Sequence, residues 1–122
     1  MERLCSLILP LLLAGCSLSV DEHQDGMNRV ENAIVMPAGA RPWQEYARYY
    51  SVEPDGKIIG IFIIPDNRDR QNKFYNLSAG NRRWVGDYRN LPSIVDGGCG
   101  VLTVTLDPKS RKREGPFCNG EA

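Results

Sequence analysis

The feature that most constrains the fold is an apolar segment near the middle of the chain, residues 57–64 (Lys-Ile-Ile-Gly-Ile-Phe-Ile-Ile). Hydrophobic side chains occupy both alternating sets of positions. A short run of this kind, bounded by turn signals, is typical of a strand that is buried on both faces. We therefore expect a central strand here, and Gly60 within it indicates close packing or a bulge.

The segments before this strand contain patterns typical of a turn, a strand and a helix. Residues 53–56 (Glu-Pro-Asp-Gly) form a strong turn signal, and residues 49–52 have the composition of a strand. Earlier in the chain, four apolar residues recur at helical spacing: Trp43, Tyr46, Ala47 and Tyr50. Pro42, just before them, is suited to the first position of a helix. The pattern predicts a short amphipathic helix that runs into a strand.

The rest of the chain indicates short elements. Residues 65–73 are predicted to be a polar loop, and residues 74–77 and 81–85 are predicted to be short strands. Twelve glycines and eight prolines in 122 residues favour many turns over long helices. The predicted fold class is a small α+β domain with one short helix and a mainly antiparallel sheet.

The amino terminus has the pattern of an export signal. Arg3 precedes an apolar stretch that ends at Leu13 and is too short for a spanning helix, which needs roughly 20 residues. The next residues, Leu13-Ala14-Gly15-Cys16, resemble the lipobox of bacterial lipoprotein signals. The resemblance implies that Cys16 receives a diacylglyceryl group and becomes the first residue of the mature chain. The alternatives are a plain secretory signal or a buried amino-terminal helix.

This resemblance sets the expected organisation of the chain. Residues 1–15 are a signal peptide, residues 16–33 a lipidated and flexible tether, and residues 34–122 the globular domain. The tether prediction follows from a mostly polar segment without a sustained helical or alternating period. In Gram-negative lipoproteins a residue other than Asp after the lipidated cysteine usually goes with outer-membrane sorting, so Ser17 predicts the periplasmic face of the outer membrane.

The four cysteines take distinct roles under this interpretation. Cys5 leaves with the signal and Cys16 carries lipid, so Cys99 and Cys118 remain as a pair in an oxidising compartment. The midpoint between them falls in a turn signal, residues 107–110 (Asp-Pro-Lys-Ser), after a β-branched run at residues 101–106. We expect a terminal β-hairpin closed by a Cys99–Cys118 disulfide.

Several chemistries are disfavoured. Fifteen basic residues balance fifteen acidic ones, so the chain has no broad field that would attract nucleic acid. The only histidine, His23, lies in the predicted tether, which argues against Cys-His or Ser-His-Asp catalysis. Too few ligands remain for zinc, and no phosphate-binding or dinucleotide motif occurs, so neither a metal nor a cofactor is expected.

Two basic clusters are candidate binding surfaces. The first combines residue types that are enriched at binding hot spots: Arg82, Arg83, Trp84, Tyr88 and Arg89. Its plainer interpretation is a core Trp with surface arginines beside it. The second cluster follows the Pro108 turn, at residues 109–113, and is expected to be a solvated hairpin end, with contact to anionic lipid or an envelope polymer as the alternative.

The predicted function is a non-enzymatic envelope lipoprotein that is anchored to the membrane through Cys16 and serves in binding or structural support. Its partner is expected to be an envelope protein or polymer. One alternative is an inhibitor of a wall-degrading enzyme such as lysozyme, in which a protruding loop at residues 80–88 enters a catalytic cleft; residues 78–84 are loosely similar to a segment of lysozyme-inhibitor lipoproteins. The second alternative is a hydrolase that uses paired carboxylates.

Overall fold

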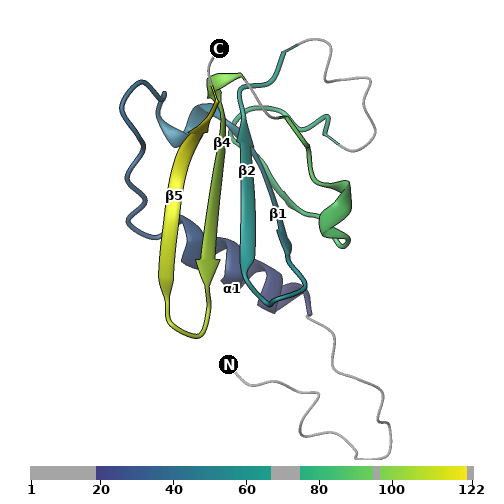
Figure 1. The fold of residues 1–122 in the computed structure, drawn as a ribbon. Coiled ribbons are helices and arrows are strands. Elements are labelled where there is room, and N and C mark those ends of the chain that lie inside the picture. Colours follow the sequence, from purple (N-terminus) through teal and green to yellow (C-terminus); the bar gives the residue numbers. More distant parts are fainter. Residues whose placement is uncertain (1–18, 67–74, 95–96, 121–122) are drawn as a thin grey trace, which may run out of the picture.

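The computed structural model describes residues 19–66, 75–94 and 97–120. They form one helix and a five-stranded mixed sheet (Figure 1). The predicted signal peptide, Cys16, most of the predicted loop at 65–73 and Phe74 lie outside the described residues. The α+β fold class is confirmed.

The sheet has the strand order β3-β1-β2-β4-β5. The bounds of the strands are β1 Ala47–Val52, β2 Ile58–Ile63, β3 Arg82–Trp84, β4 Gly98–Asp107 and β5 Lys112–Asn119. All neighbouring pairs are antiparallel except β1 and β3, which are parallel. The apolar run of residues 57–64 therefore supplies the middle strand, as predicted.

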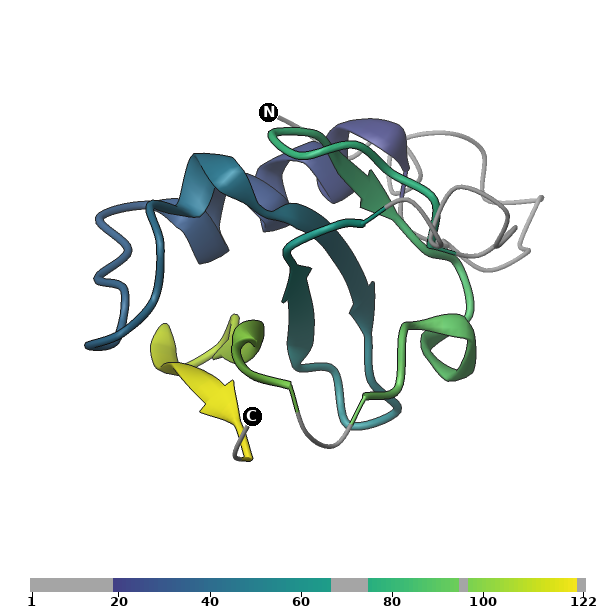
Figure 2. The same ribbon diagram turned by 90° about the horizontal axis from the view of Figure 1, so that it is seen from above.

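Two layers cover the sheet. On one face the helix α1, Val20–Glu31, packs Met27 and Val30 against Phe62 and Leu102. On the other face the segment 75–94 covers a second cluster that includes Tyr49. Figure 2 shows α1 on one side of β1 and β2 and the part of this segment that follows β3 on the other side, which explains why β2 is apolar in both alternating sets.

Gly60 provides close packing rather than a bulge. It pairs with Tyr50 on β1 and with Val104 on β4 in an unbroken register. A Cβ atom at Gly60 would lie 2.8 Å from Cε2 of the Tyr50 ring, so only glycine leaves the space that this buried aromatic side chain occupies.

The terminal hairpin forms as predicted. β4 and β5 are joined through the turn after Asp107, and Cys99 and Cys118 form a disulfide with a Cα–Cα distance of 4.4 Å. The turn is closed by a hydrogen bond of 2.7 Å from the Arg111 N–H to the Asp107 carbonyl oxygen. Asp107 also accepts from the Lys109 N–H through its side chain, which is the role that this residue type plays in turns.

The helix is not where the spacing of Trp43, Tyr46, Ala47 and Tyr50 predicted it. Residues Trp43–Glu45 form one turn of 3-10 helix, η3, and β1 begins at Ala47. Residues 46–50 are all buried, because the strand is covered on both faces, and this burial overrides the helical spacing of its aromatic side chains.

The prediction of a flexible tether at residues 16–33 is wrong for residues 20–31, which form α1. Ser19 and Glu22 cap the start of the helix reciprocally, each side chain accepting from the other residue's N–H at 3.2 and 3.0 Å. Met27 and Val30 are then buried one turn apart against the sheet. The cap, these two apolar side chains and polar contacts to the sheet stabilise a helix whose other positions are mostly polar, because the sheet supplies the surface against which it packs.

Candidate functional site

The five residues of the first basic cluster do not form one surface. Arg82 and Trp84 lie on the side of β3 that faces α1, whereas Arg83 points to the opposite side of the sheet, where its guanidinium donates to the Asn76 side chain at 3.3 Å. Arg89 is paired with Asp87 at 2.9 Å in the 3-10 turn η5, Tyr88–Asn90, next to the exposed Tyr88. The cluster is divided because side chains alternate between the two faces of a strand.

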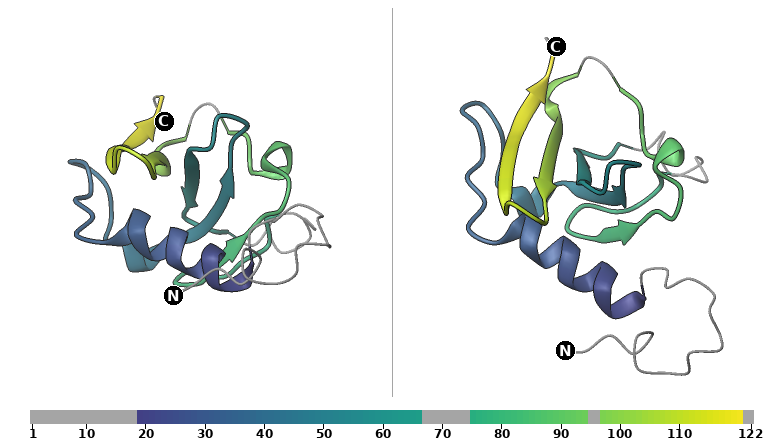
Figure 3. Two further views of the ribbon diagram at one scale, coloured as in Figure 1. Left: turned by 90° about the horizontal axis from the view of Figure 1, so that it is seen from below. Right: turned by 60° about the horizontal axis from the view of Figure 1, so that its bottom comes forward.

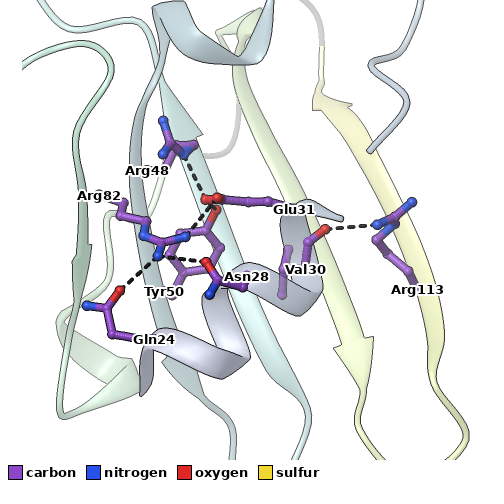
Figure 4. A network of polar contacts seen from close by, with 8 residues as sticks. All are labelled: Gln24, Asn28, Val30, Glu31, Arg48, Tyr50, Arg82 and Arg113. Carbon is purple, nitrogen blue, oxygen red and sulfur yellow. Dashed lines mark hydrogen bonds and ion pairs between the residues drawn. The ribbon is translucent and has the colours of Figure 1, made fainter. Parts of the chain in front are cut away.

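Arg82 is occupied by the helix. Its Nη1 donates to Glu31 Oε1 at 2.8 Å, and its Nη2 donates to the side-chain oxygens of Gln24 and Asn28, each at 2.8 Å (Figure 4). A guanidinium with these partners orients α1 on the sheet. It is not available as a binding hot spot.

Trp84 is covered by His23 of α1. The two rings are stacked with their centroids 4.4 Å apart and an interplanar angle of 10°. Partial burial lowers the pKa of His23, an effect that neighbouring Glu22 partly offsets. The prediction that His23 lies far from the fold is therefore wrong, since it is a contact between the helix and β3.

Glu31 is the centre of the polar network between α1 and the sheet. Its side chain is 10% exposed and its Oε2 accepts from Arg48 Nε at 2.9 Å and from the Tyr50 hydroxyl (Figure 4). Burial, and then the charge of Glu31, raise the pKa of Tyr50 far above its usual value. The Arg48 guanidinium also lies over the Trp43 ring, 4.5 Å from its centroid. A carboxylate with this set of donors serves to hold the fold together.

Arg113 of β5 closes the carboxyl end of α1. Its Nη1 donates to the carbonyl oxygens of Val30 and Asn32 at 2.9 and 2.7 Å, and its Nη2 donates to that of Ala33 at 3.0 Å. Carbonyl groups at the end of a helix lack partners within the helix, and a cation there is favourable for the helix dipole. Arg113 therefore links β5 to α1.

An open groove lies beside this link, between the last turns of α1 and the β4–β5 turn. The right view of Figure 3 shows the β4–β5 turn next to α1, and residues of both elements line the groove. The groove has a volume of about 750 Å³ and is lined by Asn28, Arg29, Asn32, Ala33, Leu106, Arg111 and Arg113. We call it the arginine groove.

The arginine groove is a cationic surface. Arg29 and Arg111 are both exposed, and neither guanidinium forms an ion pair with a carboxylate within the described residues. Its lining holds three arginines and no acidic residue. The arrangement is suited to an anionic group that accepts hydrogen bonds from guanidinium and amide donors. Arg111 and Arg113 belong to the second basic cluster of the sequence, whereas Arg29 lies in the segment that was predicted to be a tether.

A second, smaller groove of about 210 Å³ lies near the same turn and combines opposite charges. Asp107 and Glu114 line it together with Lys57 and Lys112. Its Asp107 carboxylate accepts the Lys109 N–H, and this bond lowers its pKa below the usual range. Paired-carboxylate catalysis needs a proton donor with a raised pKa, so Asp107 is not suited to that role.

Further candidates for a functional site in the described residues are a thiol nucleophile, a metal site and a protruding inhibitory loop. Cys99 and Cys118 are joined to each other and so offer no thiol nucleophile. Within residues 19–66, 75–94 and 97–120 there is no group of three or more His, Cys, Asp or Glu side chains that could hold a metal ion. Residues 80–88, which the inhibitor hypothesis required to protrude, include β3, whose three residues pair with β1.

No protein-family model matches this chain, and neither a curated protein nor a solved structure is significantly similar to it. In the part of the chain that the structure describes, no helix is long and apolar enough to cross a bilayer.

Proposed function

We propose that this chain is the precursor of a cell-envelope lipoprotein and that its domain is a non-enzymatic binding module held against a membrane. The Leu13-Ala14-Gly15-Cys16 tetrapeptide supports this proposal, because its resemblance to the lipobox implies a lipid on Cys16. With Ser17 as the next residue, the proposed location is the periplasmic face of the outer membrane of a Gram-negative cell. The anchor is durable because each buried methylene contributes about 0.8 kcal/mol and more than one acyl chain inserts.

The observation that carries the proposed position of the domain is that α1 begins only a few residues after Cys16 in the sequence. The helix begins at Val20 and its cap is Ser19, three residues after Cys16. Three residues span at most about 11 Å when fully extended. A lipid on Cys16 would therefore hold the folded domain directly at the bilayer surface, much closer than a tether of residues 16–33 would place it.

The disulfide supports the same compartment. Structural disulfides form and persist outside the reducing cytosol. The Cys99–Cys118 bond joins the two strands of the terminal hairpin, so the domain contains a cross-link that an exported protein can retain.

The experiment is a comparison of two cysteine variants of the full chain in Gram-negative cells fed an alkyne-bearing palmitate analogue. Cys16→Ser should abolish labelling and release the protein from the membrane fraction, because it removes the proposed acceptor. Cys5→Ser is the matched control and should keep both the label and the membrane location, since Cys5 lies in the predicted signal. Labelling that survives in Cys16→Ser would contradict the proposal.

A further inference from the structure

We propose that the arginine groove binds the anionic, phosphate-bearing headgroup of a membrane lipid, one that carries a net negative charge. This inference rests on the proposed function, because it takes the lipid from the membrane to which Cys16 would be anchored. The binding groups are the guanidinium groups of Arg29 and Arg111, with the side-chain amides of Asn28 and Asn32 beside them.

Arg29 and Arg111 differ from the other arginines that the structure describes. Arg48 and Arg82 bind Glu31, Arg41 binds Glu45, and Arg89 binds Asp87. Arg83 donates to an amide oxygen and Arg113 donates to three carbonyl oxygens. Of the arginines in described positions, only the two that project from α1 and from the β4–β5 turn into the groove lack such partners.

The backbone of Arg111 has a conformation that is energetically unfavourable for a residue with a long side chain. Its φ of 65° lies in the left-handed region, where glycine and asparagine are accommodated more readily than a long side chain. The turn holds this conformation through the hydrogen bond from the Arg111 N–H to Asp107. The Arg111 side chain faces an open groove. Local backbone strain next to a groove is a feature that often accompanies binding sites.

Arg113 makes the groove more favourable for an anion. The carboxyl end of a helix carries a partial negative charge that would repel a phosphate. Here the carbonyl oxygens of Val30, Asn32 and Ala33 accept hydrogen bonds from Arg113, so their charge is offset. The charges of Arg29 and Arg111 remain to attract a ligand.

The position of the groove favours a lipid over a free phosphate ion. Arg29 lies nine residues after Val20, which corresponds to roughly 14 Å along a helix at 1.5 Å per residue. Together with the short link to Cys16, this places the groove within about 25 Å of the proposed anchor. The groove is open and, at about 750 Å³, is far larger than one phosphate group needs, so it can admit a headgroup that remains attached to its acyl chains.

The test measures thermal unfolding of the full-length chain in neutral-detergent micelles that contain increasing fractions of phosphatidylglycerol. A ligand that binds only the folded state, at free concentration L, stabilises it by RT ln(1 + L/Kd), so the melting temperature rises with the logarithm of ligand concentration once this exceeds the Kd. We expect dose-dependent stabilisation by phosphatidylglycerol and none by phosphatidylcholine, whose headgroup has no net charge. Inorganic phosphate should act only at concentrations about tenfold higher, because it lacks attachment to the micelle.

Two variants remove the proposed contacts without removing the fold. Arg29→Gln changes an exposed helical position, and Arg111→Asn places at the left-handed position a residue that tolerates it. Each should raise by about tenfold the fraction of phosphatidylglycerol that is needed for a given rise in melting temperature, relative to the unaltered chain. The matched control, Arg41→Gln, removes an equal charge from an exposed side chain near the Cys99 end of β4 and should leave the response unchanged.

Several results would overturn the proposal. They are an absent response to phosphatidylglycerol, an equal response in the groove variants and in Arg41→Gln, or an equal affinity for inorganic phosphate. A Cys16→Ser chain separates this inference from the proposed function: it should lose lipidation in cells, and in micelles it should still respond to phosphatidylglycerol, although at a higher fraction because the chain is no longer anchored in the micelle. Failure of lipidation in the unaltered chain would refute the anchor, whereas failure of the response would refute the groove.

Discussion

Arg82 of β3 and Glu31 of α1, which are 51 positions apart in the chain, form an ion pair of 2.8 Å between the edge of the sheet and the end of the helix. Arg48 and Tyr50 donate to the same carboxylate. The segment that was expected to be a tether is thus fixed to the domain by a shared anionic group. As a result, the folded part of the chain begins close to Cys16.

Replacing Glu31 by Gln should lower the free energy of unfolding by about 3 kcal/mol, because Arg48 is buried and would lose its charged partner. Urea denaturation of the full chain measures this change. Glu45→Gln is the control, since it breaks an exposed pair with Arg41 and should cost less than about 1 kcal/mol. Equal losses in the two variants would show that Glu31 does not hold α1 to the sheet.

Gly60→Ala should be strongly destabilising, by about 2–3 kcal/mol, because the new Cβ atom would meet the Tyr50 ring at 2.8 Å. Gly86→Ala provides the comparison, since a Cβ atom there would meet nothing within 4 Å. It should be neutral or slightly stabilising through its effect on the unfolded chain. Calorimetric melting of both variants separates close packing from the general effect of replacing glycine.

Converting Cys99 and Cys118 together to Ser should reduce the free energy of unfolding by about 3 kcal/mol, as expected for a bond that closes a loop of this length. The unaltered chain should lose a similar amount when a reductant is added, whereas the double variant should not respond. If reductant left the melting temperature of the unaltered chain unchanged, the disulfide would contribute no stability.

The stability of the fold should fall as the pH is lowered below about 6.5, the ordinary pKa of histidine. His23 has a lowered pKa in the folded state, so the unfolded chain takes up the proton first. The contribution of His23 to stability is complete above its pKa in the unfolded chain. It is lost as the pH falls through the lower pKa that His23 has in the folded chain. Because His23 is the only histidine, His23→Phe should flatten this pH dependence between 5 and 7 while it preserves an aromatic contact with Trp84.

The parts of the fold that were predicted correctly depend on local patterns. The run at residues 57–64 has apolar side chains on both faces, and it became the central strand β2. The turn signal between Cys99 and Cys118 fixed the terminal hairpin and its disulfide. In each case the chain carries the deciding information within a short segment.

The missed features depend on contacts between distant segments. Helix α1 buries only Gly26, Met27 and Val30, so its period is weak, although the Ser19–Glu22 capping box was a local signal for its start. The arginine groove joins residues of α1 to the β4–β5 turn, and no local pattern relates Arg29 to Arg111. The structure does not bring the candidate residues at 82–89 onto one surface, because side chains alternate between the two faces of β3.

The central claim is that lipid on Cys16 holds this domain at a membrane surface. Mass spectrometry of the mature protein from Gram-negative cells tests it most directly. The account predicts an amino-terminal peptide that begins at Cys16 and carries the added mass of a diacylglyceryl group and a further acyl chain. A mature chain that begins at another residue, or an unmodified Cys16, would contradict it.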